Sequence, residues 1–355
     1  MPIIILFLVG LLAQSPQSKP TPAAPPVMRV DPQAPQVNLP AQPSSPRKNE
    51  PQEVSEDDVI SVDTSVVNVP VSVLEHNGKY VPDLRKEDFR LWEDGIEQKL
   101  AYYAHFEKPI TVALLIDVSD STVEVLPEIR RAAITFVEQL RPDDHVMLMT
   151  FDSRLNILSE PTTDRDALRK AIASVKPGQG TRLYDAVDFV VNHRLKKISG
   201  RKALVVFTDG VDTSSRATAR GTLHDLEEQE ILVYPVQYET ELYLREQTGN
   251  SDTLPKFSDG GNARHKAYEQ AKLYLNGIAS TSGGSLYAAN GRQSIALSFA
   301  QVAEALRWQY SLGYYPQPPG EPGTRHKVKV RVNRPKVAVR AKQSYVRLPQ
   351  SETKK

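Results

Sequence analysis

Apolar runs alternate with amphipathic segments through the middle of the chain. The run at 110–116 predicts a buried strand, and further strands are expected at 146–151, 203–208, 231–236 and 285–287, with an edge strand at 154–158. Apolar residues at helical spacing begin at Ile129 and predict a first helix there. A second helix is expected at 164–175, with Asp164 as its N-cap, and a third after Thr181. Further helices are expected at 217–229, 267–279 and 294–307. This alternation predicts an α/β fold, a doubly wound and mostly parallel sheet with helices on both faces.

Both flanks of this central domain have the shorter period of β-strands. Before it, alternation at 59–62 and 66–74, an Asn77-Gly78 turn and the segment 89–95 predict strands and a hairpin. After it, strands are expected at 308–316, 326–332 and 337–340. A few short strands are marginal alone, so we expect the flanks, 57–107 and 308–348, to pair into one small antiparallel β module. The central domain, 108–307, would then be an insertion in that module.

The N-terminal segment predicts export. Residues 3–12 are apolar, too few for a comfortable membrane span but the right length for a signal peptide cleaved after Ala13. No basic residue precedes them, and an uncleaved N-terminal anchor is the main alternative. Residues 14–56 read as a disordered linker, because eleven of the 27 prolines lie between Gln14 and Glu53. The expected location is therefore the periplasm, the cell envelope or the exterior, with a short tail at 349–355.

Oxygen-bearing side chains follow the expected strands where they end. Asp117, Ser119 and Ser121 come directly after the first strand, and their shared parity would place them on one side of an extended segment. Gly178-Gln179-Gly180-Thr181 precedes a helix, and the strand at 203–208 stops at Asp209-Gly210. The carboxyl ends of parallel strands meet in one crevice, and hard oxygen donors suit Mg²⁺. An ordinary polar turn with a helix N-cap remains an alternative for the first of these segments.

This set of residues resembles the von Willebrand factor A domain. The metal-ion-dependent adhesion site of that family combines an Asp-x-Ser-x-Ser run with a distant Thr and a more distant Asp, which are matched here, in order, by Asp117, Ser119, Ser121, Thr181 and Asp209. The resemblance implies that the three hydroxyls bind Mg²⁺ directly, with Mn²⁺ or Ca²⁺ as alternative ions, and that the two carboxylates act largely through water. It also implies an open coordination position that accepts Asp or Glu from a partner protein.

Four further residues border the expected site. Asp120 stands where the family usually has a small residue, and this extra carboxylate would either strengthen metal binding or weaken the attraction for an acidic partner. Gly180, Gly210 and Asp212 complete the border, and Asp212 is expected to serve in a turn or cap. The flanks are similar to those of a bacterial group of secreted proteins related to this family, found in acidobacteria, through Asp88-Phe89, Asp94-Gly95 and the run 310–316.

The expected function is metal-dependent adhesion or protein binding without turnover. One alternative is a structural envelope scaffold whose metal site is rarely occupied. The other is a Mg²⁺-dependent phosphoryl-transfer enzyme of the haloacid dehalogenase type, but Ser119 stands where such enzymes place a second Asp. The loop at 178–181 also lacks the Lys of a P-loop.

Composition narrows the function classes further. A net charge of +1 gives no electrostatic case for nucleic acid, and the chain has no Cys for disulfides, thiolate metal sites or Cys nucleophiles. The seven His residues show no zinc-ligand spacing, which argues against zinc. Lys327, Lys329 and Arg331 alternate with valines as on a solvated strand. The polar stretch 239–264 is expected to be a long surface loop.

Overall fold

The computed structural model describes residues 66–105, 108–238, 262–289 and 292–347, all of them within one compact unit. The predicted signal segment at 1–13, the linker at 14–56, the strand at 59–62, most of the loop at 239–264 and the tail at 349–355 lie outside the described residues. Within the described part, no helix combines the length and the apolar character needed to cross a membrane.

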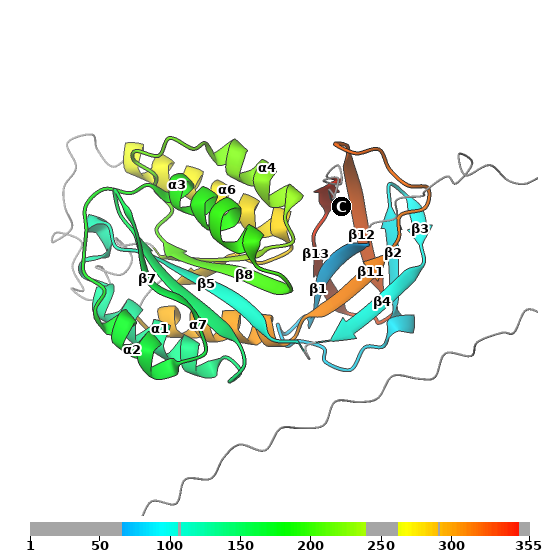
Figure 1. Cartoon of the computed structure of the whole chain (residues 1–355), viewed down its shortest axis with the longest axis horizontal. Coiled ribbons are helices and arrows are strands. Elements are labelled where there is room, and N and C mark those ends of the chain that lie inside the picture. Colours follow the sequence, from blue (N-terminus) through cyan, green and yellow to red (C-terminus); the bar gives the residue numbers. More distant parts are fainter. Residues whose placement is uncertain (1–65, 106–107, 239–261, 290–291, 348–355) are drawn as a thin grey trace, which may run out of the picture. The chain divides into compact units, whose positions relative to one another are not determined.

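The central domain is built on a six-stranded sheet (Figure 1). In spatial order its strands are β10 (Tyr287–Ala289), β9 (Leu232–Tyr238), β8 (Arg201–Thr208), β5 (Ile110–Asp117), β6 (His145–Phe151) and β7 (Leu155–Thr162). All neighbouring strands are parallel except β7, which runs antiparallel to β6 at the edge. The predicted doubly wound, mostly parallel sheet is confirmed.

Helices cover both faces of this sheet, and the strand β5 shows why. Val112, Leu114 and Ile116 belong to one core with helices α1 (Leu126–Gln139), α2 (Arg165–Ala173) and α7 (Arg292–Arg307). Ala113 and Leu115 point to the other core, with helices α3 (Leu183–Asp188), α4 (Ala219–Glu228) and α6 (Asn262–Ser282). A strand that is apolar on both sides needs a cover on both sides.

Helix ends agree with the local sequence. The Asp164 carboxylate accepts the Ala167 N–H at 2.9 Å and caps α2, as predicted. Thr218 caps α4 through the Gly221 N–H at 3.0 Å. After α3 the chain continues through a π-helical turn (Phe189–Arg194) and a 3₁₀ turn, η5 (Leu195–Lys197), which the sequence pattern did not predict.

The two flanks pair with each other, as predicted. They form two four-stranded sheets, each with antiparallel neighbours, in the orders β13-β1-β11-β4 and β14-β12-β2-β3. The N-terminal strands are β1 (Val67–Glu75), β2 (Phe89–Glu93), β3 (Ile96–Gln98) and β4 (Leu100–His105), with a 3₁₀ turn, η2, at Lys86–Asp88. The C-terminal strands are β11 (Tyr310–Tyr314), β12 (Arg325–Val332), β13 (Val337–Ala341) and β14 (Ser344–Val346).

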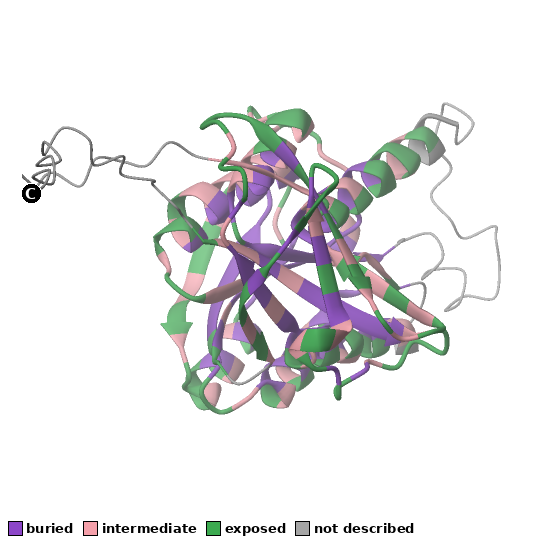
Figure 2. Ribbon diagram, turned by 90° about the vertical axis from the view of Figure 1, so that its right-hand side faces the viewer, coloured by how far each residue is buried: buried purple, intermediate pink, exposed green. Residues whose placement is uncertain are grey.

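The apolar side chains of both sheets of the β module share a third core. It includes Val71, Leu91 and Tyr310, all fully buried, and Figure 2 shows buried residues concentrated along the strands. The predicted Asn77-Gly78 turn is present, with Gly78 at a φ of +83°, but the chain after it returns only through an isolated bridge between Leu74 and Tyr80. Each sheet of the β module thus combines strands from the N-terminal and C-terminal flanks.

Candidate functional site

The strands β5 and β8 end side by side, and their last residues start the site. Ile116 pairs with Phe207 in the parallel ladder, which places Asp117 next to Thr208. The Thr208 hydroxyl donates to Asp117 Oδ2 at 2.7 Å. Asp209 follows at once, and its charge acts on Asp117. Two carboxylates from distant parts of the sequence therefore face one crevice.

The segment after β5 turns sharply. Asp117 Oδ1 accepts the Ser119 N–H at 2.9 Å, and a 3₁₀ turn, η3 (Asp120–Thr122), follows. The prediction that residues 117–121 stay extended is wrong, because this Asx turn gives the backbone a local partner that an extended segment would lack. The turn still brings the Ser119 and Ser121 hydroxyl oxygens to 3.1 Å from each other.

The loop that carries Thr181 is tied to both of these segments. The Gly178 N–H donates to Val118 O at 2.6 Å, which joins the loop to the end of β5. On the other side, the Thr213 N–H donates to Thr181 O at 3.0 Å, and the Thr181 N–H donates to the Thr213 hydroxyl at 3.0 Å. A Cβ on Gly178 would lie 1.9 Å from Asp152 Oδ2, so this approach requires glycine. Backbone hydrogen bonds thus hold Thr181 between the Asp117 and Asp209 loops.

The charges at this site are buried. The Asp117 side chain is 0% exposed and Asp209 is 4% exposed. Burial raises the pKa of Asp117 to about 7, and the neighbouring Asp209 charge adds to the effect. The groups that oppose this shift are Ser119 and Thr208, which are neutral donors. Two buried carboxylates with neutral hydroxyl donors form an oxygen set that fits a divalent cation, because such an ion would balance both charges.

Comparison with known proteins agrees with this geometry. Residues 112–211 match the family model of the von Willebrand factor type A domain. The chain contains a von Willebrand factor type A domain. No curated protein matches the chain.

Several solved structures are similar to this chain at low sequence identity. BatB from Bacteroides thetaiotaomicron is 16% identical with a TM-score of 0.41, over 55% of this chain and 99% of that chain. A von Willebrand factor type A protein from Catenulispora acidiphila is 10% identical with a TM-score of 0.44, over 74% of each chain. Proximal thread matrix protein 1 from the mussel byssus, solved with a zinc-occupied MIDAS motif, is 12% identical with a TM-score of 0.43, over 58% of this chain and 47% of that chain.

Thr208 and Tyr238 were missed as residues of the A-domain site, whereas Thr213 was read from the sequence as a turn or capping residue at its border. Thr208 and Thr213 hold Asp117 and Thr181 as described, and Tyr238 lies at the end of β9. The Tyr238 hydroxyl is 3.3 Å from Ser121 Oγ, and its ring stacks on Phe207 with centroids 4.7 Å apart. Burial raises the Tyr238 pKa, and the nearby Asp209 and Asp117 add to the effect, so the phenol stays protonated. Strand pairing was the only signal for Thr208, since it follows directly from the register with Asp117.

The four expected border residues have separate roles in the A domain. Asp120 is exposed beside the turn, and Gly180 has a φ of +70°, which favours glycine. Gly210 has a φ of +86°, and a Cβ there would lie 2.9 Å from side-chain atoms of α6. Asp212 accepts the Tyr184 N–H at 3.3 Å and the Ser215 N–H at 3.1 Å, so it serves as a cap and turn residue, as expected.

Proposed function

We propose that this protein binds a partner protein through a divalent cation held at the carboxyl ends of β5 and β8. The observation that carries the proposal is the buried pair of carboxylates, Asp117 and Asp209, in which the Asp209 charge acts on Asp117 and the donors beside Asp117 are the neutral groups of Ser119 and Thr208. The residues that would hold the ion are Asp117, Ser119, Ser121, Thr181 and Asp209. Mg²⁺ is the first candidate because all the donors are hard oxygens, and Mn²⁺ and Ca²⁺ follow for the same reason.

The proposed ligand is an acidic side chain of the partner. Two carboxylates balance the charge of a dication while the hydroxyl donors add none, so the bound ion would remain attractive to a further anionic oxygen. Ser121 and Asp120 lie at the solvent side of the turn, being half-buried and exposed, respectively. An Asp or Glu that approaches from solvent would therefore reach the site at Ser121.

Binding without turnover is favoured by the way Asp117 is held. Both of its oxygens accept hydrogen bonds, from the Ser119 N–H and from the Thr208 hydroxyl, and its side chain is fully buried. A nucleophilic carboxylate needs an oxygen that can reach a substrate. A carboxylate that is fixed on both sides suits the support of an ion better.

Export is part of the proposal. It is supported by the apolar segment 3–12 and by the proline-rich stretch after it, which together are typical of a signal segment followed by a spacer. A protein on the outer side of a membrane meets divalent cations and the surfaces of other proteins. Both are what a cation-dependent binding domain needs.

The test begins with calorimetric titration of Mg²⁺ into the full chain. The wild type should bind one ion, Asp209→Asn should bind at least about tenfold more weakly, and Asp143→Asn, the same change at an exposed turn, should match the wild type. Absence of binding in the wild type would favour the scaffold alternative. Release of phosphate from generic phosphoesters would favour the enzyme.

Partner binding is then tested with the same proteins immobilised. Cell-envelope extract is passed over wild type, Asp209→Asn and Asp143→Asn, each with Mg²⁺ and with EDTA. A partner of the proposed kind is retained by wild type and Asp143→Asn, and only with Mg²⁺. A purified candidate should then lose binding when a single surface Asp or Glu is changed to its amide. Equal retention by all three proteins in EDTA would contradict the proposal.

A further inference from the structure

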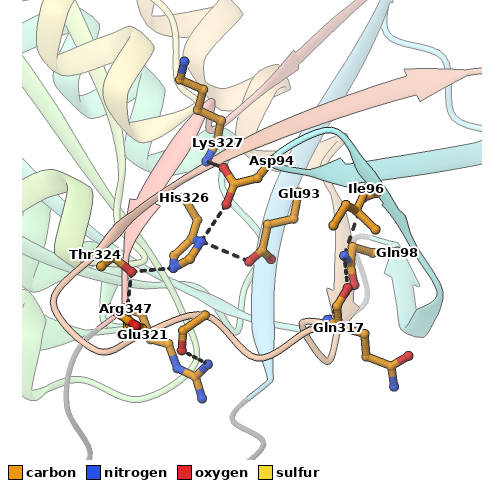
Figure 3. A network of polar contacts seen from close by, with 11 residues as sticks. Glu93, Asp94, Ile96, Gln98, Gln317, Glu321, Thr324, His326, Lys327 and Arg347 are labelled. Atoms are coloured by element: carbon orange, nitrogen blue, oxygen red, sulfur yellow. Dashed lines mark hydrogen bonds and ion pairs between the residues drawn. The ribbon is translucent and has the colours of Figure 1, made fainter.

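A second group of metal-binding side chains lies in the β module, away from the A-domain site. Glu93 ends β2, Asp94 begins the turn after it, and His326 lies on β12, which pairs with β2 (Figure 3). His326 Nδ1 is 2.8 Å from Asp94 Oδ2 and 3.3 Å from Glu93 Oε1. One ligand atom from each of the three residues lies within 4.8 Å of the others. Strand pairing thus brings together residues from opposite ends of the sequence.

The Thr324 hydroxyl fixes the role of one nitrogen of the His326 ring. His326 Nε2 is 2.8 Å from the Thr324 hydroxyl oxygen. The single proton of that hydroxyl is donated to the Glu321 carbonyl, so the hydroxyl can only accept from the ring. Nε2 therefore carries a proton, and Nδ1 faces the two carboxylates. Nδ1 then has two ways to meet the carboxylates: it carries a second proton and donates to Asp94 Oδ2 at 2.8 Å, or it offers its lone pair to a metal ion that the carboxylates share.

The Glu93 carboxylate is buried beside the hydroxyls of Tyr314 and Tyr345. Its side chain is 5% exposed, and Oε2 makes no hydrogen bond of good geometry with any described residue. The hydroxyls of Tyr314 and Tyr345, also buried, lack such a bond in the described part of the chain. Polar side chains therefore line the buried side of the cluster formed by Glu93, Asp94 and His326.

We propose that Glu93, Asp94 and His326 bind a zinc ion. The donor set of one imidazole nitrogen and two carboxylate oxygens suits Zn²⁺, and the ligand atoms of a tetrahedral zinc lie about 3.3 Å apart. The Nδ1 to Glu93 Oε1 separation of 3.3 Å already has this value. The Nε2–H bond to Thr324 is the kind of outer contact that fixes the tautomer of a zinc-bound histidine. The exposed side of Asp94, 47% accessible, leaves a fourth position for water.

Neighbouring backbone holds the ligands in place. The Lys327 N–H donates to Asp94 Oδ1 at 2.8 Å and leaves Oδ2 for the ion. Gly320 packs its backbone against the His326 ring, because a Cβ there would lie 2.2 Å from His326 Cε1. Zinc at this position joins β2 of the N-terminal flank to β12 of the C-terminal flank. Its effect is therefore structural, a clamp on the β module.

The experiment is a zinc titration of the full chain in the Asp117→Asn background, in which the A-domain site is weakened. The parent should bind one Zn²⁺, and its unfolding temperature should rise. Glu93→Gln and His326→Gln should weaken zinc binding by more than about 100-fold. His224→Gln is the matched control, since His224 pairs with Glu228 at 3.5 Å on an exposed helix face, and it should bind like the parent.

Cobalt(II) provides a second readout, because its visible absorption reports tetrahedral coordination and should be lost in His326→Gln. If His326→Gln fails to fold, Asp94→Asn at the exposed ligand gives the same comparison. Equal zinc affinity in parent, Glu93→Gln and His326→Gln would overturn the proposal. Absence of zinc binding by the parent would also overturn the proposal. In that case His326 Nδ1 would carry a proton in place of the ion.

Discussion

The replacement of Asp117 by Asn should make the metal-free protein more stable, although it removes a residue of the site. The new amide would keep the acceptor for the Ser119 N–H and would carry no charge beside Asp209. Its nitrogen would face the Thr208 hydroxyl, which in the wild type donates to Asp117 Oδ2. The lost donation from Thr208 costs about 1 kcal/mol.

The gain follows from proton binding. The Asp117 carboxyl has a pKa of about 7 in the folded chain, against an ordinary value of 3.8. Between these values the folded state binds more protons than the unfolded state, so the stability of the wild type falls as pH rises from about 4 to about 7 when no cation is bound. The full loss is at most about 4 kcal/mol above this range. The Asn variant avoids this loss, so the net gain in EDTA at about pH 8 is up to about 3 kcal/mol, or roughly 5 °C in Tm for a folded unit of this size.

Thermal denaturation with EDTA or Mg²⁺, at about pH 8 and about pH 4, checks this reasoning. In EDTA at the higher pH the variant should unfold above the wild type, and at the lower pH the difference should disappear or reverse. Mg²⁺ should raise the Tm of the wild type and leave the variant unchanged. The control Asp143→Asn, at an exposed turn, should follow the wild type throughout. A variant that unfolds well below the wild type in EDTA at the higher pH would show that Asp117 serves the fold and would refute the argument.

Three further outcomes are expected. Gly210→Ala should destabilise the fold by about 2–4 kcal/mol in urea denaturation, because the new Cβ would lie 2.9 Å from two α6 side chains. Gly200→Ala is the control: Gly200 has a φ of +82° but open space around it, so the change should cost about 1 kcal/mol. Thr208→Val should weaken Mg²⁺ binding in calorimetry by a few fold while Asp117 keeps its place, and unchanged affinity would contradict the role given to its hydroxyl. Lys342 is 7% exposed and donates to three carbonyls at the end of α4. Burial lowers its pKa from 10.5 to about 8, so the free energy of unfolding should rise with pH between these two values. Lys342→Met should remove that rise in a series of denaturation curves at different pH.

The hydrophobic pattern alone was sufficient to predict the central sheet. The strand at 110–116 is apolar on both sides, and only a strand covered by two helical layers has this pattern. The edge strand β7 was also recognised, and it runs longer than expected, to Thr162. In the β module, β3, β4 and β14 were missed. Their side chains are half-buried or exposed except Gln98 and Leu100, so their patterns carry little periodicity.

The candidate site was predictable only in part, because the hydrophobic pattern of a strand indicates which of its residues are buried but not which strand lies next to it. The positions of Asp117, Thr181 and Asp209 after strands and before a helix predict that they meet, and in the structure the Asp209 charge acts on Asp117. Tyr238 gave no such signal, because the strand was expected to stop at residue 236 and the structure extends it to Tyr238. The sequence left a turn at Ser119 as an alternative to an extended segment, because an Asx turn competes with extension through one hydrogen bond, which alternation does not record.

Both groups of acidic residues have the same origin in long-range pairing. Asp117 meets Thr208 and Asp209 because β5 and β8 are neighbours, and Glu93 meets His326 because β2 and β12 are neighbours. In each case side chains that could bind a cation meet near the end of a strand, where the ladder fixes the backbone. Both proposals rest on this juxtaposition of carboxylates, which a cation would stabilise. A scan of strand ends for facing acceptors would therefore have found the His326 cluster, which the spacing of histidines along the sequence had argued against.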